Sequence, residues 1–278
     1  MSPTFVFVHG SNGNSLGWAP LQRELALRGH RSLAVDLPGH GFGTTFPRAY
    51  QAPQDQAELS KTPSRLAGIT SEDNIAHVVD TLRRVREHGP AILVGHSRGG
   101  FTVTGVGNAA PDLVDRLVYI SAWCCVDATP AEYMTGPEYA TSALHETAGV
   151  LAADPAELGA LRMNWRTADP ELLTALKNAV LADGTEDEFL AYLNTLEPDE
   201  ILDSSHSQAR AETWGAIPRT YVRLAQDRSI PLALQDRFIR EADALTPANP
   251  FTVETLESSH AGFLVRPGEA AELLAGMV

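Results

Sequence analysis

Short apolar segments, several of them rich in β-branched residues, alternate along this chain with longer segments of helical periodicity. The candidate strands are residues 5–8, 32–36, 91–94, 117–120, 220–224 and 251–256. Strands that are apolar on both faces are typical of a parallel sheet covered by helices on each side. The alternation therefore predicts an α/β fold built on a doubly wound, mostly parallel sheet.

The clearest predicted helix covers residues 71–88, between the second and third candidate strands. Ser71 is its expected N-cap, and Glu72 and Asp73 suit the positive end of the helix. Its apolar residues form one stripe, which consists of Ile75, Val78, Val79, Leu82 and Val85. Such a stripe predicts a helix that packs on the sheet.

Two segments interrupt the alternation. Residues 43–70 are polar and rich in Pro and Gln, which predicts a long loop of the kind used as a lid or binding loop. From about residue 127 the chain has no convincing strand, only helical patterns such as 170–181 and 186–196. We therefore expect an α/β core in two parts, 1–126 and 215–278, with an inserted helical cap over residues 127–214.

The third candidate strand continues directly into Gly95, His96, Ser97, Arg98 and Gly99, a G-x-S-x-G sequence followed by a predicted helix over residues 98–109. A strand, a sharp turn and a helix in this order expose a strained serine above the sheet, and the glycines are needed because the turn is too tight for side chains. The alternative is a glycine-rich turn with an incidental serine. The context favours Ser97 as a nucleophile.

A serine hydroxyl needs a base to take its proton. His260 follows the last candidate strand and is expected on the same sheet edge as Ser97. Asp227, just past the strand that ends near Leu224, completes the order nucleophile, acid, base. Asp127, beyond the fourth strand, is the competing acid, and Asp227 is favoured because its loop is shorter.

Acyl transfer also needs hydrogen-bond donors for the developing oxyanion. We expect these to be the backbone N–H of Arg98, which follows the nucleophile, and the backbone N–H of Ser11 in the loop after the first strand. Gly10 and Gly13 in that loop would let the backbone approach the reacting carbon closely.

These motifs, together with residues 5–10 (FVFVHG), 36–41 (DLPGHG) and 227–231 (DRSIP), resemble the α/β-hydrolase fold. The nearest resemblance is to the branch that holds plant methyl-ester esterases, hydroxynitrile lyases and their bacterial esterase relatives. It covers the core, and the insertion matches loosely. The resemblance implies a serine hydrolase that cleaves a carboxylic ester or lactone of a small, largely apolar molecule through an acyl-enzyme on Ser97.

The chain departs from that branch at several positions. Hydroxynitrile lyases carry Thr where Gly10 stands and Lys where Ala261 stands, which argues against cyanohydrin cleavage. Arg98 replaces the apolar or aromatic residue of the plant esterases, and we expect its guanidinium to tie down a loop rather than to bind a substrate carboxylate. Gly10, Trp123 and Ala261 are candidate pocket residues. Further pocket candidates are the aromatic residues of the insertion, which are Tyr133, Tyr139, Trp165, Phe189 and Tyr192.

Composition restricts the partners. The 278 residues carry 21 basic and 35 acidic side chains, a net charge of −14, which argues against nucleic-acid and membrane-surface partners. The only cysteines, Cys124 and Cys125, are adjacent and give no disulfide framework or metal-ligand spacing. With no secretory signal and no long apolar stretch, we expect a cytoplasmic protein with a small-molecule substrate and no cofactor or metal.

Three alternatives remain open. The first is a specialised acyl-transfer or ring-opening enzyme of natural-product biosynthesis on the same scaffold, which would ignore generic esters. The others are a hydroxynitrile lyase and a non-catalytic ligand receptor. A nicotinamide enzyme is disfavoured, because the G-x-G-x-x-A sequence at residues 105–110 lies within a predicted helix and neither lysine has a tyrosine four residues before it.

Overall fold

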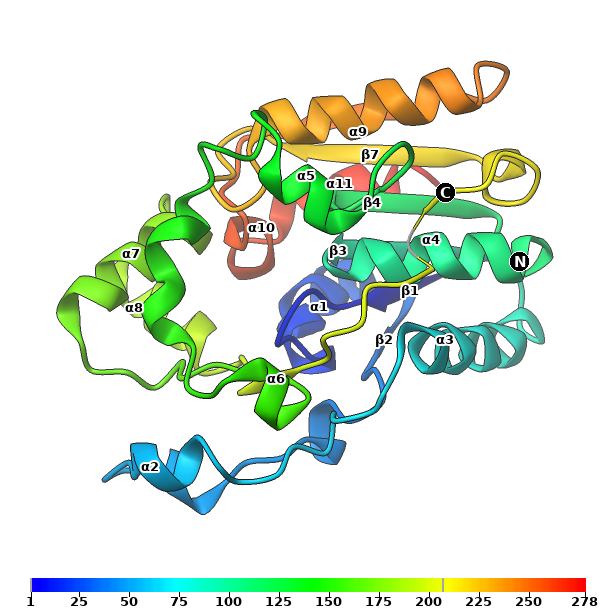
Figure 1. Ribbon diagram of the computed structural model, residues 1–278. Helices are drawn as coiled ribbons and strands as arrows, with labels where there is room; N and C mark the ends of the chain where they lie inside the picture. The colour runs from blue at the N-terminus through cyan, green and yellow to red at the C-terminus, as the bar shows by residue number, and fades with distance from the viewer. Residues whose placement is uncertain (1, 207) are drawn as a thin grey trace.

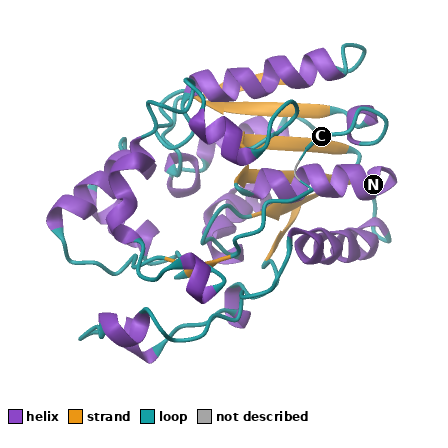
Figure 2. Ribbon diagram, viewed as in Figure 1, coloured by secondary structure: helices purple, strands orange, loops and turns teal. Residues whose placement is uncertain are grey.

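The computed structural model describes residues 2–206 and 208–278 and shows a parallel sheet as its centre (Figures 1 and 2). The sheet has 6 strands in the order β2-β1-β3-β4-β7-β8. Their bounds are β1 (Thr4–Val8), β2 (Arg31–Val35), β3 (Ala91–Ser97), β4 (Arg116–Ala122), β7 (Arg219–Leu224) and β8 (Thr252–Leu256). Every pair of neighbours is parallel, so the predicted α/β fold class and all of the candidate strands are confirmed.

Helices cover both faces of this sheet. One layer contains α3 (Ser71–Arg86), α4 (Gly99–Ala109) and α9 (Leu232–Leu245), and the other contains α1 (Ala19–Leu27), α10 (Gly262–Val265) and α11 (Gly268–Ala275). Strand β1 shows why its sequence is apolar throughout. Val6 and Val8 pack into the first layer, whereas Phe5 and Phe7 pack into the second, because successive side chains of a strand point to opposite faces.

The N-cap of helix α3 is Thr70 and not the predicted Ser71, which is the first residue of the helix. The Thr70 hydroxyl accepts the Asp73 N–H at 3.2 Å, and the Asp73 carboxylate accepts the Thr70 N–H at 2.9 Å. This reciprocal capping box explains the shift, because Asp73 stands three residues after Thr70. The Ser71 N–H instead donates to Asp203 at 2.8 Å.

The regular structure within residues 127–214, which we call the insertion, is mostly helical and is joined by long loops. Helices α7 (Pro170–Val180) and α8 (Glu186–Leu193) lie together away from the sheet, on the left in Figure 1. Helices α5 (Pro130–Thr135) and α6 (Pro155–Leu158) belong to the same insertion. The insertion also contains two antiparallel strands, β5 (Leu161–Arg162) and β6 (Asp199–Glu200), so the expectation that it holds no strand was wrong. Strands this short leave no periodic signal in the sequence.

The predicted long loop, residues 43–70, contains helix α2 (Gln56–Leu59) and docks on the insertion. Arg162, which is fully buried, makes several of the contacts between them. Its guanidinium donates to Asp199 through Nε and Nη2 at 2.6 Å each, to the Leu59 carbonyl at 2.8 Å, and to the Thr62 carbonyl. The remaining short elements are the 3-10 helices Ser15–Trp18, Gly41–Gly43, Arg48–Tyr50, Pro111–Leu113, Ala143–Val150 and Trp214–Ala216.

Candidate active site

Ser97 is the last residue of β3 and has a left-handed backbone with φ of 53°. This conformation is strained for a residue with a side chain, and it is held by close packing on both sides of the turn. A Cβ atom at Gly99 would lie 2.6 Å from the His9 carbonyl oxygen, and one at Gly100 would lie 2.1 Å from the Trp123 carbonyl oxygen. The glycines after Ser97 are therefore required by close approach of the backbone, as the sequence predicted.

We predict that Gly100→Ala lowers the free energy of unfolding by roughly 1–3 kcal/mol or more, because the clash is with a backbone oxygen in the core. Gly268→Ala is the matched control. A Cβ atom there has nothing within 4 Å, so the substitution should leave stability equal or slightly higher. Urea unfolding of both variants measures the difference, and equal midpoints would contradict the packing argument.

His260 and Asp227 meet at the same end of the sheet. The Asp227 Oδ2 lies 2.6 Å from His260 Nδ1, so this ring nitrogen donates to the carboxylate and Nε2 is left as the basic nitrogen. Asp227 Oδ1 accepts the backbone N–H groups of Ser229 at 2.7 Å and Ile230 at 2.9 Å. The structure brings Asp227 to His260, whereas the competing Asp127 is exposed. Asp227 is thus held in place by backbone N–H groups of its own loop as well as by His260.

Ser121 also contacts this acid, which the sequence did not indicate. It lies near the end of β4 with φ of 36°, and its buried hydroxyl donates to Asp227 Oδ2 at 2.6 Å. The same carboxylate oxygen therefore accepts from both Ser121 and His260. A serine in an apolar strand carries no periodic signal, so only the register of β4 beside β7 could have located it.

A cavity of about 430 Å³ opens above Ser97 and His260, and both residues line it. Gly10 and Ser11 line it from the loop after β1, and side chains of the insertion form the opposite wall. This wall is largely apolar and consists of Leu144, Thr147, Ala148, Val150, Leu151, Leu161, Met163, Trp165, Val180, Tyr192, Thr195 and Leu196. Among the described residues, the lining contains no Asp, Glu, Lys or Arg.

Two of the predicted pocket residues, Trp123 and Ala261, lie outside the described lining of this cavity and are corrected here. Trp123 belongs to the core, where its ring packs 5.6 Å from Phe238 and 5.7 Å from Phe101. Ala261 is fully buried beneath apolar residues of the insertion. Both side chains follow strand ends, as predicted, but they point into packed layers, which the position in the sequence does not specify.

The aromatic residues of the insertion divide in the same way. Trp165 and Tyr192 line the cavity, whereas Tyr133, Tyr139 and Phe189 are buried in packed clusters. Tyr133, for example, packs its ring on Phe238 of α9 at 5.0 Å. Most of these residues therefore hold the insertion together and on the core, as expected.

Arg98 turns its side chain away from this cavity. Its guanidinium donates to the carbonyls of Ile201 at 3.1 Å and Asp203 at 2.6 Å. It thereby ties the segment after β6 to the start of α4, which is the loop-anchoring role expected from the sequence. The backbone N–H groups of Ser11 and Arg98 stay predictions as oxyanion donors.

A buried charged cluster lies behind the cavity, formed by His40, Glu197 and Glu200. His40 Nδ1 lies 3.1 Å from Glu197, and Nε2 lies 3.6 Å from Glu200. Burial alone would lower the pKa of His40, but the two carboxylates raise it to about 10. Burial would raise the pKa of Glu200, but His40 and Arg98 lower it to about 2. The neighbouring His9 is buried beside His40, and both effects lower its pKa to about 4.

We predict from these shifts that the protein loses stability at alkaline pH. The pKa of His40 is raised in the folded state, so its contribution is present below 6.5 and is lost as the pH rises through about 10. Unfolding free energy should therefore fall between these pH values, and the fall should be smaller in His40→Gln. Urea titrations of both proteins across this range measure it. Parallel pH profiles would contradict the assignment of His40 as the titrating group.

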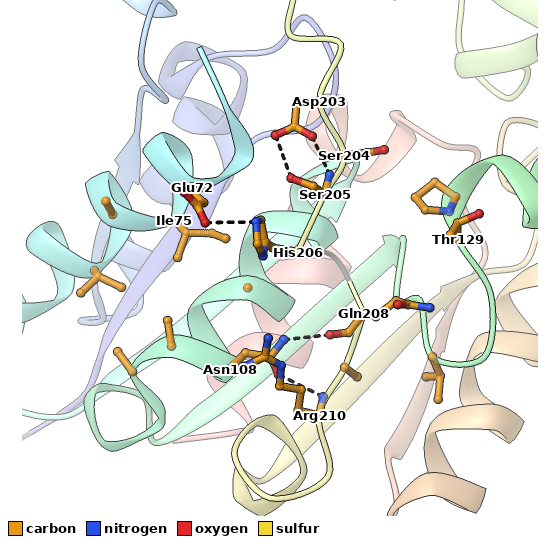
Figure 3. A pocket seen from close by; sticks show the side chains of 18 of the residues that line it. Glu72, Ile75, Asn108, Thr129, Asp203, Ser204, Ser205, His206, Gln208 and Arg210 are labelled. Carbon is orange, nitrogen blue, oxygen red and sulfur yellow. Dashed lines mark hydrogen bonds and ion pairs between the residues drawn. The ribbon is translucent and has the colours of Figure 1, made fainter. Parts of the chain in front are cut away.

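A second and larger hollow, of about 1080 Å³, lies between α3, α4 and the segment around residues 202–210 (Figure 3). Its walls are partly apolar and partly polar. On the polar part, His206 is paired to Glu72 at 3.1 Å and the Asn108 amide donates to the Gln208 carbonyl at 2.8 Å. Ser97, His260 and Asp227 do not lie on its described walls. The cavity above Ser97 is therefore the candidate site.

In the part of the chain that the structure describes, no group of three or more His, Cys, Asp or Glu side chains is arranged to hold a metal ion. Among the same described residues, no helix has the length and apolar character needed to cross a membrane.

Comparison with known proteins assigns the fold and the family. A model of the alpha/beta hydrolase family matches residues 5–273. The chain belongs to the alpha/beta hydrolase family. The family expected from the sequence is thus confirmed.

Three relatives show what the chain is similar to. It is 24% identical over 271 residues to the pyrethroid hydrolase of Sphingobium wenxiniae, covering 97% of this chain and 85% of the relative. It is 23% identical over 289 residues to the polyneuridine aldehyde esterase of Rauvolfia serpentina, covering 97% and 93%. It is 25% identical over 241 residues to an alpha-hydroxynitrile lyase of Arabidopsis thaliana, covering 82% and 80%.

The crystal structure of polyneuridine aldehyde esterase has the same fold. It matches with a TM-score of 0.73 and 18% identity, covering 100% of this chain and 99% of that chain. The likeness extends over the insertion as well as the core.

Proposed function

We propose that this alpha/beta hydrolase is a serine esterase that cleaves a carboxylic ester or lactone of a small, largely apolar molecule. The observation that carries the proposal is the shared cavity of Ser97 and His260, with His260 hydrogen-bonded at 2.6 Å to a buried Asp227. Relatives with esterase and hydrolase names support ester hydrolysis in general.

In the proposed reaction, the Ser97 hydroxyl attacks the carbonyl carbon and His260 Nε2 takes its proton. Asp227 keeps the ring in the tautomer that exposes Nε2 and stabilises the imidazolium that forms. The N–H groups of Ser11 and Arg98 bind the developing oxyanion. His260 then protonates the leaving alcohol. Water, activated by the same ring, hydrolyses the acyl-enzyme and releases the acid.

The cavity supports the proposed substrate class. Its volume of about 430 Å³ suits a small molecule, and its described lining lacks ionic side chains. A charged acyl or alcohol group would lose its hydration there without gaining an ion pair. We therefore propose that residues 127–214 act as a cap that provides an apolar wall for an uncharged substrate.

The lyase alternative is disfavoured by packing at Gly10. A Cβ atom at this position would lie 2.9 Å from the Cβ of Ser97, so a threonine would require the turn to move. Ala261, where the lyases carry lysine, is fully buried against the insertion. Neither residue offers a polar group to a cyanohydrin.

The test is hydrolysis of p-nitrophenyl esters of increasing acyl length, with Ser97→Ala as the blank. Turnover that depends on Ser97 would support the esterase, and the chain length at which it declines would measure the acyl part of the cavity. No turnover above the blank across the whole series would contradict the proposal and favour the specialised biosynthetic enzyme or the receptor.

A further inference from the structure

Asn12, which follows the predicted oxyanion donor Ser11, is held almost entirely by the insertion. It is 1% exposed. Its backbone N–H donates to Glu200 Oε2 at 2.8 Å, and its carbonyl accepts the Glu197 N–H at 2.7 Å. Its side-chain amide donates to the carbonyls of Glu197 at 2.9 Å and Pro198 at 3.2 Å. Residues 197–200 therefore determine where Asn12 lies.

The position of Asn12 in turn determines the shape of the loop beside Ser97. Asn12 has φ of 56°, a left-handed conformation, within a turn that the Gly13 N–H closes onto the Gly10 carbonyl at 3.1 Å. The orientation of each peptide group in so tight a turn is coupled to its neighbours. Fixing the Asn12 N–H toward Glu200 therefore limits where the Ser11 N–H can point.

Glu200 is itself rigidly held. It is 3% exposed, and its other oxygen accepts the Ile201 N–H at 2.8 Å. His40 and Arg98 lie 3.6 Å and 3.8 Å from that oxygen, so two cations balance the buried carboxylates of the cluster. Arg98 comes directly after Ser97, so this one carboxylate contacts both segments that are expected to supply oxyanion donors.

We propose that Glu200 is a positioning residue for the oxyanion hole: through Asn12 it holds the turn at residues 10–13 so that the Ser11 N–H faces the reacting carbonyl. The inference rests on the proposed esterase function. It makes the cap part of the catalytic geometry as well as a wall of the cavity. A preorganised donor has its largest effect in the transition state, where the oxygen carries charge.

The test variant is Glu200→Gln. A carboxylate accepts with both oxygens, whereas an amide must direct its NH₂ group toward the Asn12 N–H or the Ile201 N–H, and either arrangement opposes two donors. We expect kcat for the best p-nitrophenyl ester to fall by about 10- to 100-fold, with KM within a factor of about three, because the lost contact acts on the transition state.

Asp203→Asn is the matched control. It is the same change of acid to amide, three residues away, and Asp203 likewise accepts a backbone N–H of the core, from Ser71 at 2.8 Å. That bond lies at the start of α3 and not at the turn of Asn12. Asp203→Asn should keep the wild-type kcat and KM, so the comparison separates loss of cap attachment from loss of oxyanion geometry.

A second variant, Asn12→Gly, covers the case in which Glu200→Gln does not fold. Glycine adopts the left-handed conformation without strain but lacks the side-chain bonds to residues 197 and 198. We expect kcat to fall about 10-fold. Stability should also fall, because the carbonyls of Glu197 and Pro198 lose a buried donor. Affinity for a trifluoromethyl ketone, whose adduct carries an oxyanion, should fall by the same factor as kcat in both variants.

The outcomes separate this inference from the proposed function. Suppose the wild type hydrolyses esters, and both Asn12→Gly and folded Glu200→Gln keep its kcat and its affinity for the ketone. This result would overturn the inference and leave the esterase proposal standing. An equal loss in Asp203→Asn would also overturn it. A wild-type protein with no turnover dependent on Ser97 would overturn both proposals.

Discussion

Ser97→Ala is expected to lower ester hydrolysis by about 10⁴- to 10⁶-fold in kcat, because the variant lacks the proposed nucleophile. The residual rate reflects binding and oxyanion stabilisation alone. Substrate binding should persist, because the cavity and its apolar wall do not depend on the hydroxyl. Initial rates with the best p-nitrophenyl ester measure the loss, and equilibrium binding of a non-hydrolysable amide analogue measures the retained affinity.

His260→Ala is the companion variant and should be impaired to a similar degree, because the two residues act as a unit. The double variant should therefore be hardly worse than either single one. Additive losses in the double variant, or substantial activity in either single variant, would contradict the proposed roles.

Asp227→Asn is expected to lower kcat by about 10⁴-fold while leaving the fold in place. The side-chain amide can offer its NH₂ group to the histidine, which favours the ring tautomer with its proton on Nε2. That tautomer cannot accept the serine proton. Measuring kcat at several pH values separates this effect from a change in substrate binding.

Asp127→Asn is the matched control for this prediction. Asp127 is the competing acid in the sequence, yet it is exposed, and its substitution should leave kcat within a factor of about two. A larger loss in Asp127→Asn than in Asp227→Asn would reverse the assignment of the acid. Ser121→Ala, which removes a donor to the same carboxylate, should have an intermediate effect.

Local sequence signals were sufficient for the sheet and for the proposed nucleophile. The four central strands, β1, β3, β4 and β7, are buried almost throughout, so their apolar runs could be recognised without knowledge of their neighbours. The edge strands β2 and β8 are largely exposed and were located by the turns that bound them. The strained turn at Ser97 could also be predicted from local sequence, because the strand, the glycines and the helix that form it are adjacent in the chain. The pairing of His260 with Asp227 followed from chain order together with the rule that loops after parallel strands share one edge.

Residues that act through distant contacts could not be predicted in this way. Glu200 and Asn12 are 188 positions apart, and their contact depends on how the insertion docks. Trp123 and Ala261 were placed at the correct edge of the sheet, but the direction of a side chain after a strand end depends on the backbone of the loop. Arg162 shows the same limit, since its partners lie in β6 and in the loop at residues 43–70.

The most direct test of the account is to locate the covalent adduct formed with a fluorophosphonate, which reacts with activated serines. The wild-type protein should gain one phosphonyl group, carried on Ser97 within the tryptic peptide that spans residues 87–98. His260→Ala should react far more slowly, because the serine would lack its base. An active enzyme that remains unlabelled, or that carries the label on another residue, would contradict the proposal that Ser97 is the nucleophile.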